Sequence, residues 1–467
     1  MDFNLCFCND TISAIATPIG EGGIGIIRIS GSNASAVANR LFRQRKPARP
    51  LTSHQLHHGW IVDPDSQEIV DEVLLSYMAG PHTYTREDVV EINCHSGFMV
   101  LSQILELVLR NGARLAEPGE FTRRAFLSGR IDLSQAEAVL DVIHSRSQQS
   151  LKLAGLQLRG DFRNRVLEWR EQLLRLQTVL EAFIDFGDDL DEDASESSFS
   201  LHLLEEELIS PLQHMIDTYE SGRILREGFT LVLVGKPNVG KSSLLNVLLG
   251  KDRAIVTHLP GTTRDVIEDS FLLSGVLVKI LDTAGIRLEP DAIESIGIER
   301  TLASIGEADA VLWLIDQSRQ LTDDDDKIFR TISELRHIII LNKSDLSRVV
   351  SADTVKRRYG STSPVLNLSV FDPVQIDKLR EFLADTFLRR PLERNRSALI
   401  PNLRHKVCFE EALASLQRAR ELLVESSYSE LVSLEFHSAR RSLGSVLGLE
   451  ADEDLLDSIF SNFCIGK

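Results

Sequence analysis

Residues 235–242 have the types and spacing of a phosphate-binding loop, G-x-x-x-x-G-K-S. The apolar run 229–234 precedes them, and a helical pattern over 244–249 follows. A strand, a glycine-rich loop and a helix in this order form the setting in which such a loop binds nucleotide phosphates. A chance glycine turn is the alternative, and it is disfavoured because the motif and both flanking elements agree.

Each residue type in the loop has a chemical reason. Gly235 and Gly240 allow a tight backbone turn that approaches the phosphate oxygens. Backbone N–H groups of the loop and of the following helix N-terminus attract an anion. The Lys241 ammonium can reach the terminal phosphates and act in catalysis, and the Ser242 hydroxyl can ligate Mg²⁺. The other nucleotide contacts predicted here are Asn238, Val239 and Ser243.

Two later motifs indicate that the nucleotide is GTP. The expected strand 276–281 ends at the sequence Asp-Thr-Ala-Gly, and the expected strand 337–341 ends at Asn-Lys-Ser-Asp. The Asp345 carboxylate only accepts hydrogen bonds, so it matches the two donors of guanine and would be unpaired beside adenine. Sites built on such a bond reject the analogue that lacks it by roughly 10⁴–10⁵-fold. The predicted contacts are Asp282, Thr283, Ala284, Gly285, Asn342, Lys343 and Asp345.

The segment between these motifs reads Gly-Thr-Thr-Arg-Asp over 261–265 and is typical of a switch loop. Thr263 is the candidate second Mg²⁺ ligand, which would lose its contact after hydrolysis. Ile286 follows the Asp-Thr-Ala-Gly motif, where small Ras-type GTPases place a glutamine that orients the attacking water. Another group must therefore supply this role and the missing positive charge: an arginine finger, or a monovalent cation near the neutral oxygen of Asn238.

Composition limits the class of protein. The chain has 467 residues and a net charge of −18, so it is long enough for about three domains, and any RNA contact should be local or shared with a partner. Its five cysteines are few and scattered, which favours reduced thiols in a cytoplasmic protein over a disulfide framework. No apolar stretch approaches the length of a membrane span, and no secretion signal is visible.

The pattern along the chain predicts a multidomain protein. Strand-like runs at 24–29 and 89–92 and a helix over 100–110 indicate an α+β domain first. Apolar residues at alternating spacings of three and four then indicate long helices, before and again after the GTPase motifs. The expected fold is therefore an all-α helical domain interrupted by an inserted α/β P-loop GTPase domain. The predicted segments are 1–118 (α+β), 119–222 and 388–467 (helical), and 223–387 (GTPase).

Further motifs across essentially the whole chain resemble the MnmE (TrmE) family of bacterial and organellar tRNA-modification GTPases. They are Ala-Thr-Pro at 16–18, the glycine-rich run 22–31, Glu-Pro-Gly-Glu-Phe-Thr at 117–122, Ile-Asp-Leu-Ser-Gln-Ala-Glu-Ala at 131–138, and the tail Phe-Cys-Ile-Gly-Lys at 463–467. The combination is far more specific than a P-loop alone. Arg86 and Ser96 stand where the family has glycine, which puts the local pocket shape in doubt.

The resemblance implies a folate-binding fold for the N-terminal domain, which would also form a homodimer. It would bind a formyl-tetrahydrofolate-type one-carbon donor. The implied contacts are Arg28, Glu91, Arg130 and Lys467. Cations suit the carboxylate tail of a folate, and a carboxylate suits the donors of its pterin ring. Without the motif, a surface arginine beside a strand would be the simpler interpretation of Arg28.

The resemblance also implies that the two GTPase domains of a dimer meet across a K⁺ ion during hydrolysis. Its implied ligands are Asn238, Thr257, Thr262 and the Leu259 carbonyl. The family's catalytic glutamate maps to Glu294, whose simpler interpretation is a solvated helix charge. The nucleotide contacts implied in the switch loop are Thr257, His258, Leu259, Pro260, Gly261, Thr262 and Thr263.

The implied reaction adds a (carboxymethyl)aminomethyl group to C5 of the wobble uridine of certain tRNAs. Cys464 maps to a residue that the family needs for this modification, although a lone cysteine near a terminus is usually inert. The FAD would belong to a partner, MnmG (GidA), in a heterotetramer. Two alternatives stay open: a ribosome-assembly GTPase, and a non-enzymatic scaffold that binds GTP and a one-carbon carrier.

Overall fold

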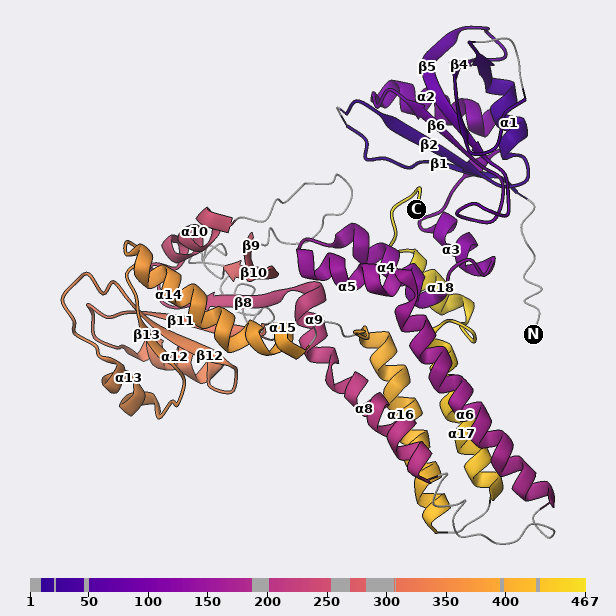
Figure 1. The fold of residues 1–467 in the computed structure, drawn as a ribbon. Helices are drawn as coiled ribbons and strands as arrows, with labels where there is room; N and C mark the ends of the chain where they lie inside the picture. The colour runs from indigo at the N-terminus through magenta and orange to yellow at the C-terminus, as the bar shows by residue number, and fades with distance from the viewer. Residues whose placement is uncertain are drawn as a thin grey trace.

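The computed structural model describes residues 10–20, 22–45, 50–186, 201–252, 269–282, 306, 308–394, 399–425 and 429–467. Figure 1 shows a sheet with helices packed against it near the N-terminus, a group of long helices, and a second sheet surrounded by helices. Among the described residues, no helix is long and apolar enough to cross a membrane.

The first sheet has the strand order β3-β4-β5-β6-β2-β1-β7, antiparallel except for the β1–β7 pair. Alternate residues of β2, such as Ile27 and Ile29, are buried against Leu101 and Ile104 of α2. The sequence analysis predicted β2, β6 and α2 but missed the other strands. Its elements are β1 (Ile12–Ile15), β2 (Gly25–Ser30), α1 (Ala34–Leu41), β3 (Phe42–Gln44), β4 (Gln55–Val62), β5 (Ile69–Met78), β6 (Val89–Cys94), α2 (Phe98–Arg110) and β7 (Arg114–Leu115).

The second sheet has the order β13-β12-β11-β8-β10-β9, and only β9 is antiparallel among the described strands. Its faces are both covered: Leu231 and Leu233 of β8 enter one apolar core, and Val232 and Val234 enter the other. Such two-sided burial explains why these strands are continuous apolar runs. The elements are β8 (Phe229–Val234), α10 (Lys241–Asp252), β9 (Asp269–Leu273), β10 (Val276–Asp282), β11 (Ala310–Asp316), α12 (Asp323–Ile332), β12 (His337–Asn342), α13 (Ala352–Tyr359), β13 (Val365–Asn367), α14 (Pro373–Leu383), η4 (Ala384–Leu388) and α15 (Arg389–Arg394).

The helices before and after this sheet share one apolar core. Trp169 and Leu173 of α6 are buried with Phe409 of α16 and Phe436 of α17. The predicted fold class, a helical unit with an inserted α/β unit, is confirmed; the predicted domain limits stay predictions. The helices are α3 (Glu120–Leu127), α4 (Leu133–His144), α5 (Gln148–Arg159), α6 (Asp161–Phe186), η2 (Leu204–Ile209), α8 (Ser210–Asp217), α9 (Tyr219–Glu227), α16 (Leu403–Val424), α17 (Ser429–Val446) and α18 (Glu453–Phe460).

The segments that lead into and out of the second sheet touch each other. A Cβ on Gly222 of α9 would lie 1.9 Å from Cγ2 of Ile400, so only glycine lets these segments approach so closely. Ile400 also lines a small cavity with Arg226 of α9 and Asp141 of α4. The junction between the second sheet and the helices therefore contains half-buried charge.

Asp141 gives this junction a pH-dependent stability. Burial raises the pKa of its carboxyl from 3.8 to about 6, against the attraction of Arg226. A folded-state pKa above the unfolded value means that the stability is fully present below about pH 4 and is lost as the pH rises through 6. Asp141→Asn should therefore raise the free energy of unfolding by about 3 kcal/mol at pH 8. Urea unfolding at several pH values checks this, and a gain that persists at pH 4 would contradict it.

Candidate functional site

The P-loop connects β8 to α10 in a conformation that depends on its glycines. Gly235 and Gly240 have φ angles of 152° and 102°, and Asn238 is also left-handed at 64°. A Cβ on Gly235 would lie 2.5 Å from the Leu314 carbonyl oxygen, and one on Gly240 would lie 2.3 Å from Nδ2 of Asn342. The loop is thus pressed against the ends of β11 and β12, where side chains larger than glycine do not fit.

Lys241 is buried at the start of α10, and its Nζ donates to the carbonyl oxygens of Gly235 and Lys236 at 2.6 and 3.0 Å. These contacts hold the ammonium within the loop that would surround the phosphates. The next residue, Ser242, is exposed at the helix N-terminus. A hydroxyl oxygen there has the chemistry of a Mg²⁺ ligand, and the exposed side-chain oxygen of Asn238 has that of a K⁺ ligand.

The strand-end motif of β12 is joined directly to the P-loop. Asn342 Nδ2 donates to the Val239 carbonyl oxygen at 2.7 Å, and both residues are buried. Asp345 accepts a hydrogen bond from Ser369 Oγ at 2.7 Å, which fixes the carboxylate that the sequence analysis assigned to guanine. The structure therefore brings the P-loop and the Asn-Lys-Ser-Asp motif together at one edge of the sheet.

Lys343 is positioned by a residue that the sequence analysis missed. Its Nζ donates to Oδ2 of Asp316 at 2.7 Å, and the Asp316 side chain is 5% exposed. Burial acts to raise the pKa of Asp316, but hydrogen bonds from Lys343 and Ser318 outweigh it and the pKa lies below its ordinary value. The available signal was the position of Asp316 at the end of an apolar strand, where parallel strands present ligand-binding groups.

Several predicted nucleotide residues cannot be placed. Asp282 ends β10, where its backbone is in register with Leu233 of β8, next to the P-loop. The side chain of Asp282 is not among the described parts of the chain. The same holds for every predicted residue of the switch loop and for the predicted catalytic glutamate. The predicted residues outside the described part of the chain are Thr257, His258, Leu259, Pro260, Gly261, Thr262, Thr263, Thr283, Ala284, Gly285 and Glu294.

A second cluster lies where the C-terminal tail meets the first sheet. Arg28 of β2 and Glu91 of β6 are register partners, and their side chains form an ion pair with an N–O distance of 2.8 Å. Arg28 Nη1 also donates to the Gly466 carbonyl oxygen at 3.2 Å, which places the neighbouring Lys467 at this cluster. Three of the four predicted folate residues are thereby brought close to one another.

Tyr84 links the fourth predicted folate residue to this cluster. The guanidinium carbon of Arg130 lies 4.8 Å from the centre of the Tyr84 ring, and that of Arg28 lies 6.0 Å from it. Two cations and an aromatic ring suit a ligand with an anionic tail and a flat ring. The sequence analysis missed Tyr84, since a tyrosine in a loop carries no distinctive spacing. Cys464, two residues before Gly466, is exposed.

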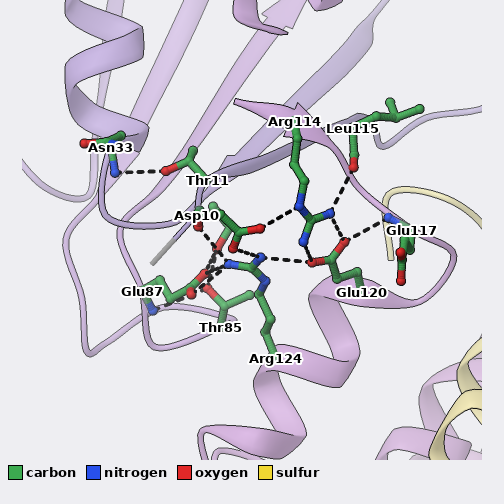
Figure 2. Close-up of polar contacts among 11 residues, drawn as sticks. Asp10, Thr11, Asn33, Thr85, Glu87, Arg114, Leu115, Glu117, Glu120 and Arg124 are labelled. Carbon is green, nitrogen blue, oxygen red and sulfur yellow. Dashed lines mark hydrogen bonds and ion pairs between the residues drawn. The ribbon is translucent and has the colours of Figure 1, made fainter. Parts of the chain in front are cut away.

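A network of charges connects α3 to the first sheet beside this cluster (Figure 2). Arg124 pairs with Asp10, Glu87 and Glu120, and Arg114 pairs with Asp10 and Glu120. Glu120 Oε2 also accepts from the Glu117 backbone N–H at 2.9 Å. Burial acts to raise the pKa of Glu120, but these partners lower it below its ordinary value. The network fixes the helix that leads to Arg130.

Removing one carboxylate from this network should lower the free energy of unfolding. Glu120, whose side chain is 9% exposed, serves two guanidinium groups, so Glu120→Gln should lower the free energy of unfolding by about 3 kcal/mol. Glu171→Gln is the control, because the pair of Glu171 with Arg175 is exposed and should contribute less than about 0.5 kcal/mol. Equal losses for the two variants in denaturant unfolding would refute the role of the network.

Comparisons with known proteins agree with this arrangement. The family model of the GTP-binding protein TrmE N-terminus matches residues 11–130, and that of the MnmE helical domain matches residues 133–464. A tRNA modification GTPase MnmE of Syntrophobacter fumaroxidans is 57% identical and covers 98% of each chain, and one of Carboxydothermus hydrogenoformans is 45% identical over 98% of this chain and 99% of its own.

One solved structure matches about a third of this chain. The match to the G domain of the FeoB iron transporter of T. maritima covers 34% of this chain and 97% of that domain at 22% identity, with a TM-score of 0.26. The match to the helical-domain model spans more than half of the chain, and the relatives are similar from end to end. The chain therefore belongs to the MnmE family of tRNA modification GTPases.

Proposed function

We propose that this protein is a GTP-hydrolysing tRNA modification enzyme. With a flavin-dependent partner of the MnmG (GidA) type, it would add a (carboxymethyl)aminomethyl group to C5 of the wobble uridine. The observation that supports the proposal is the edge of the second sheet where the P-loop and the Asn-Lys-Ser-Asp motif meet. There Asn342 donates a hydrogen bond to the P-loop, and Ser369 orients Asp345. The chain also belongs to the MnmE family. Asp345 selects guanine, Lys241 meets the terminal phosphates, and Ser242 and Thr263 ligate Mg²⁺.

Hydrolysis in this proposal depends on K⁺. Asn238, Thr257, Thr262 and the Leu259 carbonyl would hold the ion where two GTPase domains of a homodimer meet. The ion would supply charge to the phosphates. Glu294 would position the attacking water indirectly, since Ile286 cannot. The proposal is supported by the neutral oxygen of Asn238 in the P-loop and by the missing glutamine.

A comparison of salts tests this dependence. GTP turnover should be about 10²-fold faster in KCl than in NaCl at equal ionic strength. Asn238→Gly should remove most of the difference, because glycine keeps the left-handed backbone but lacks the side-chain oxygen. Bound GTP with negligible turnover in KCl would instead favour the scaffold alternative. Equal turnover in both salts would refute the role of K⁺.

The second cluster is proposed to bind a formyl-tetrahydrofolate-type one-carbon donor. Arg28, Arg130 and Lys467 would bind its carboxylate tail, and Glu91 would accept from the donors of its pterin ring. The proximity of Arg28 to the C-terminal tail supports this assignment, because it brings the exposed Cys464 to the same region. The donor would then lie near the residue that the family resemblance assigns to the modification.

Nucleoside mass spectrometry tests the function as a whole. In cells that lack this gene, C5-aminomethyl-type uridines should vanish from tRNA and should return when the wild-type protein is expressed. Cys464→Ser should not restore them, although it should hydrolyse GTP like the wild type. If these uridines are unchanged by the deletion, the modification function is refuted, and ribosome assembly becomes the next function to examine through ribosome profiles of the same cells.

A further inference from the structure

Two arginines on neighbouring helices of the helical unit form no ion pair with a carboxylate among the described residues. Arg170 lies on α6 and Arg440 on α17, which run side by side in Figure 1. Neither forms an ion pair within the described part of the chain, and the Nε atoms of both are buried without a hydrogen-bond partner there. Both side chains are half-buried. Water therefore solvates these two cations only in part.

The surroundings of Arg170 and Arg440 leave their positive charge in excess. A Cβ on Gly444 of α17 would lie 3.5 Å from the guanidinium carbon of Arg170. The Arg170 guanidinium therefore packs against the backbone of α17 at a position that has no side chain. Arg440 Nη2 donates a hydrogen bond to Nδ1 of the exposed His437 at 3.4 Å, a neutral partner that leaves the charge of Arg440 uncompensated. Glu450, whose charge acts on Arg170, is already paired with Arg441 at 2.9 Å. Together, Arg170, Arg440, Arg441 and Glu450 carry a net charge of +2 in a chain of −18.

Electrostatics makes this arrangement unfavourable without an anion. Burial and the proximity of Arg440 both lower the pKa of Arg170, although Glu450 acts in the opposite direction. Two like charges that are partly removed from water cost free energy that a shared anion would offset. Guanidinium groups present parallel N–H donors that fit the oxygens of a phosphate.

We propose that Arg170 and Arg440 form a binding site for a backbone phosphate of tRNA. This proposal rests on the proposed function and adds a contact between the helical unit and the substrate. RNA is favoured over an acidic protein segment because guanidinium N–H donors fit the oxygens of a phosphate, and tRNA is the substrate in the proposed function. The site lies toward the ends of α6 and α17 that are near α18, the helix that precedes the C-terminal tail (Figure 1).

A paired arginine in the same helical unit provides a matched control. Arg418 of α16 forms hydrogen bonds to both carboxylate oxygens of Glu435 at 3.0 and 2.9 Å. Its charge is therefore neutralised locally, whereas those of Arg170 and Arg440 are not. Replacement of any of the three by glutamine removes one positive charge and keeps a polar side chain of moderate length.

The experiment measures binding of unmodified tRNA to the full chain by fluorescence anisotropy between 50 and 200 mM KCl. Arg170→Gln and Arg440→Gln should each weaken binding about tenfold or more and should lower the slope of log affinity against log salt by about one. Arg418→Gln should bind like the wild type. GTP turnover and thermal unfolding of every variant show whether the fold and the nucleotide site are intact.

Each outcome is decisive. Equal tRNA binding by the wild type and all three variants overturns the arginine site but leaves the proposed function standing. Unchanged tRNA binding with weaker binding of a polyglutamate probe overturns RNA as the occupant and indicates an acidic protein segment. If the wild type binds no tRNA at 50 mM KCl, the site is overturned as well, and the nucleoside analysis in deletion cells still decides the proposed function independently.

Discussion

Asp345→Asn should lower the affinity for GTP by about 10⁴-fold and transfer preference to xanthosine triphosphate. The carboxylate matches the N1–H and N2–H₂ donors of guanine, and Ser369 Oγ holds its Oδ1 in place at 2.7 Å. Asparagine keeps an oxygen for Ser369 but presents an NH₂ group to the amino group of guanine. Xanthine carries a carbonyl oxygen at that position, so the new donor is satisfied there. Competition of both nucleotides against a fluorescent GTP analogue measures the change.

Asp353→Asn controls for the loss of an acidic charge, because Asp353 is exposed on α13 of the same unit. It should bind GTP like the wild type. If Asp345→Asn retained GTP affinity, or if both variants lost it equally, Asp345 would not be the base-reading group. The assignment of GTP through this residue would then fail, although the P-loop would still indicate a nucleotide.

Gly240→Ala should weaken GTP binding by about 10²-fold, since small displacements of groups that position a substrate have effects of this size. The new Cβ would lie 2.3 Å from Asn342 Nδ2, at a left-handed φ of 102°. Asn342 would have to move away, and its hydrogen bond to the Val239 carbonyl oxygen would break. The P-loop and the guanine motif would then lose their direct connection.

Gly250→Ala is the matched control, because Gly250 lies on α10, the next element, and a Cβ there meets no atom within 4 Å. This variant should bind GTP normally and should be more stable by about 1 kcal/mol, the usual difference between glycine and alanine in a helix. Calorimetric titration with GTP and denaturant unfolding separate the two effects. Normal GTP binding by Gly240→Ala would show that the contact is not essential.

The sequence was sufficient to predict the strands and motifs at the nucleotide-binding edge of the second sheet, because these elements are local and strongly patterned. The expected strands at 229–234, 276–281 and 337–341 correspond to β8, β10 and β12 within one residue at each end. A parallel strand buried on both faces must be an unbroken apolar run, and the motif that follows it must lie at the same edge as the others. The family was also predicted from motifs and is confirmed.

Most of the first sheet could not be predicted in this way. Strands β4 and β5 are antiparallel and partly exposed, so polar residues such as His58 and Glu72 interrupt their apolar pattern. Tyr84 and Arg170 were missed for a related reason. Each acquires its role from a residue distant in sequence, and the amino-acid sequence alone gives no signal for such a contact.

The sequence by itself determined the nucleotide chemistry, the fold class and the family, because glycine spacing, apolar runs and strand-end carboxylates are imposed by local backbone geometry. Only the tertiary structure decided what surrounds those groups. It placed Arg28 beside Gly466, 438 positions away, and brought Arg440 near enough to Arg170 to lower its pKa. Long-range packing brings these groups together, and their charges then interact strongly because they are partly removed from water.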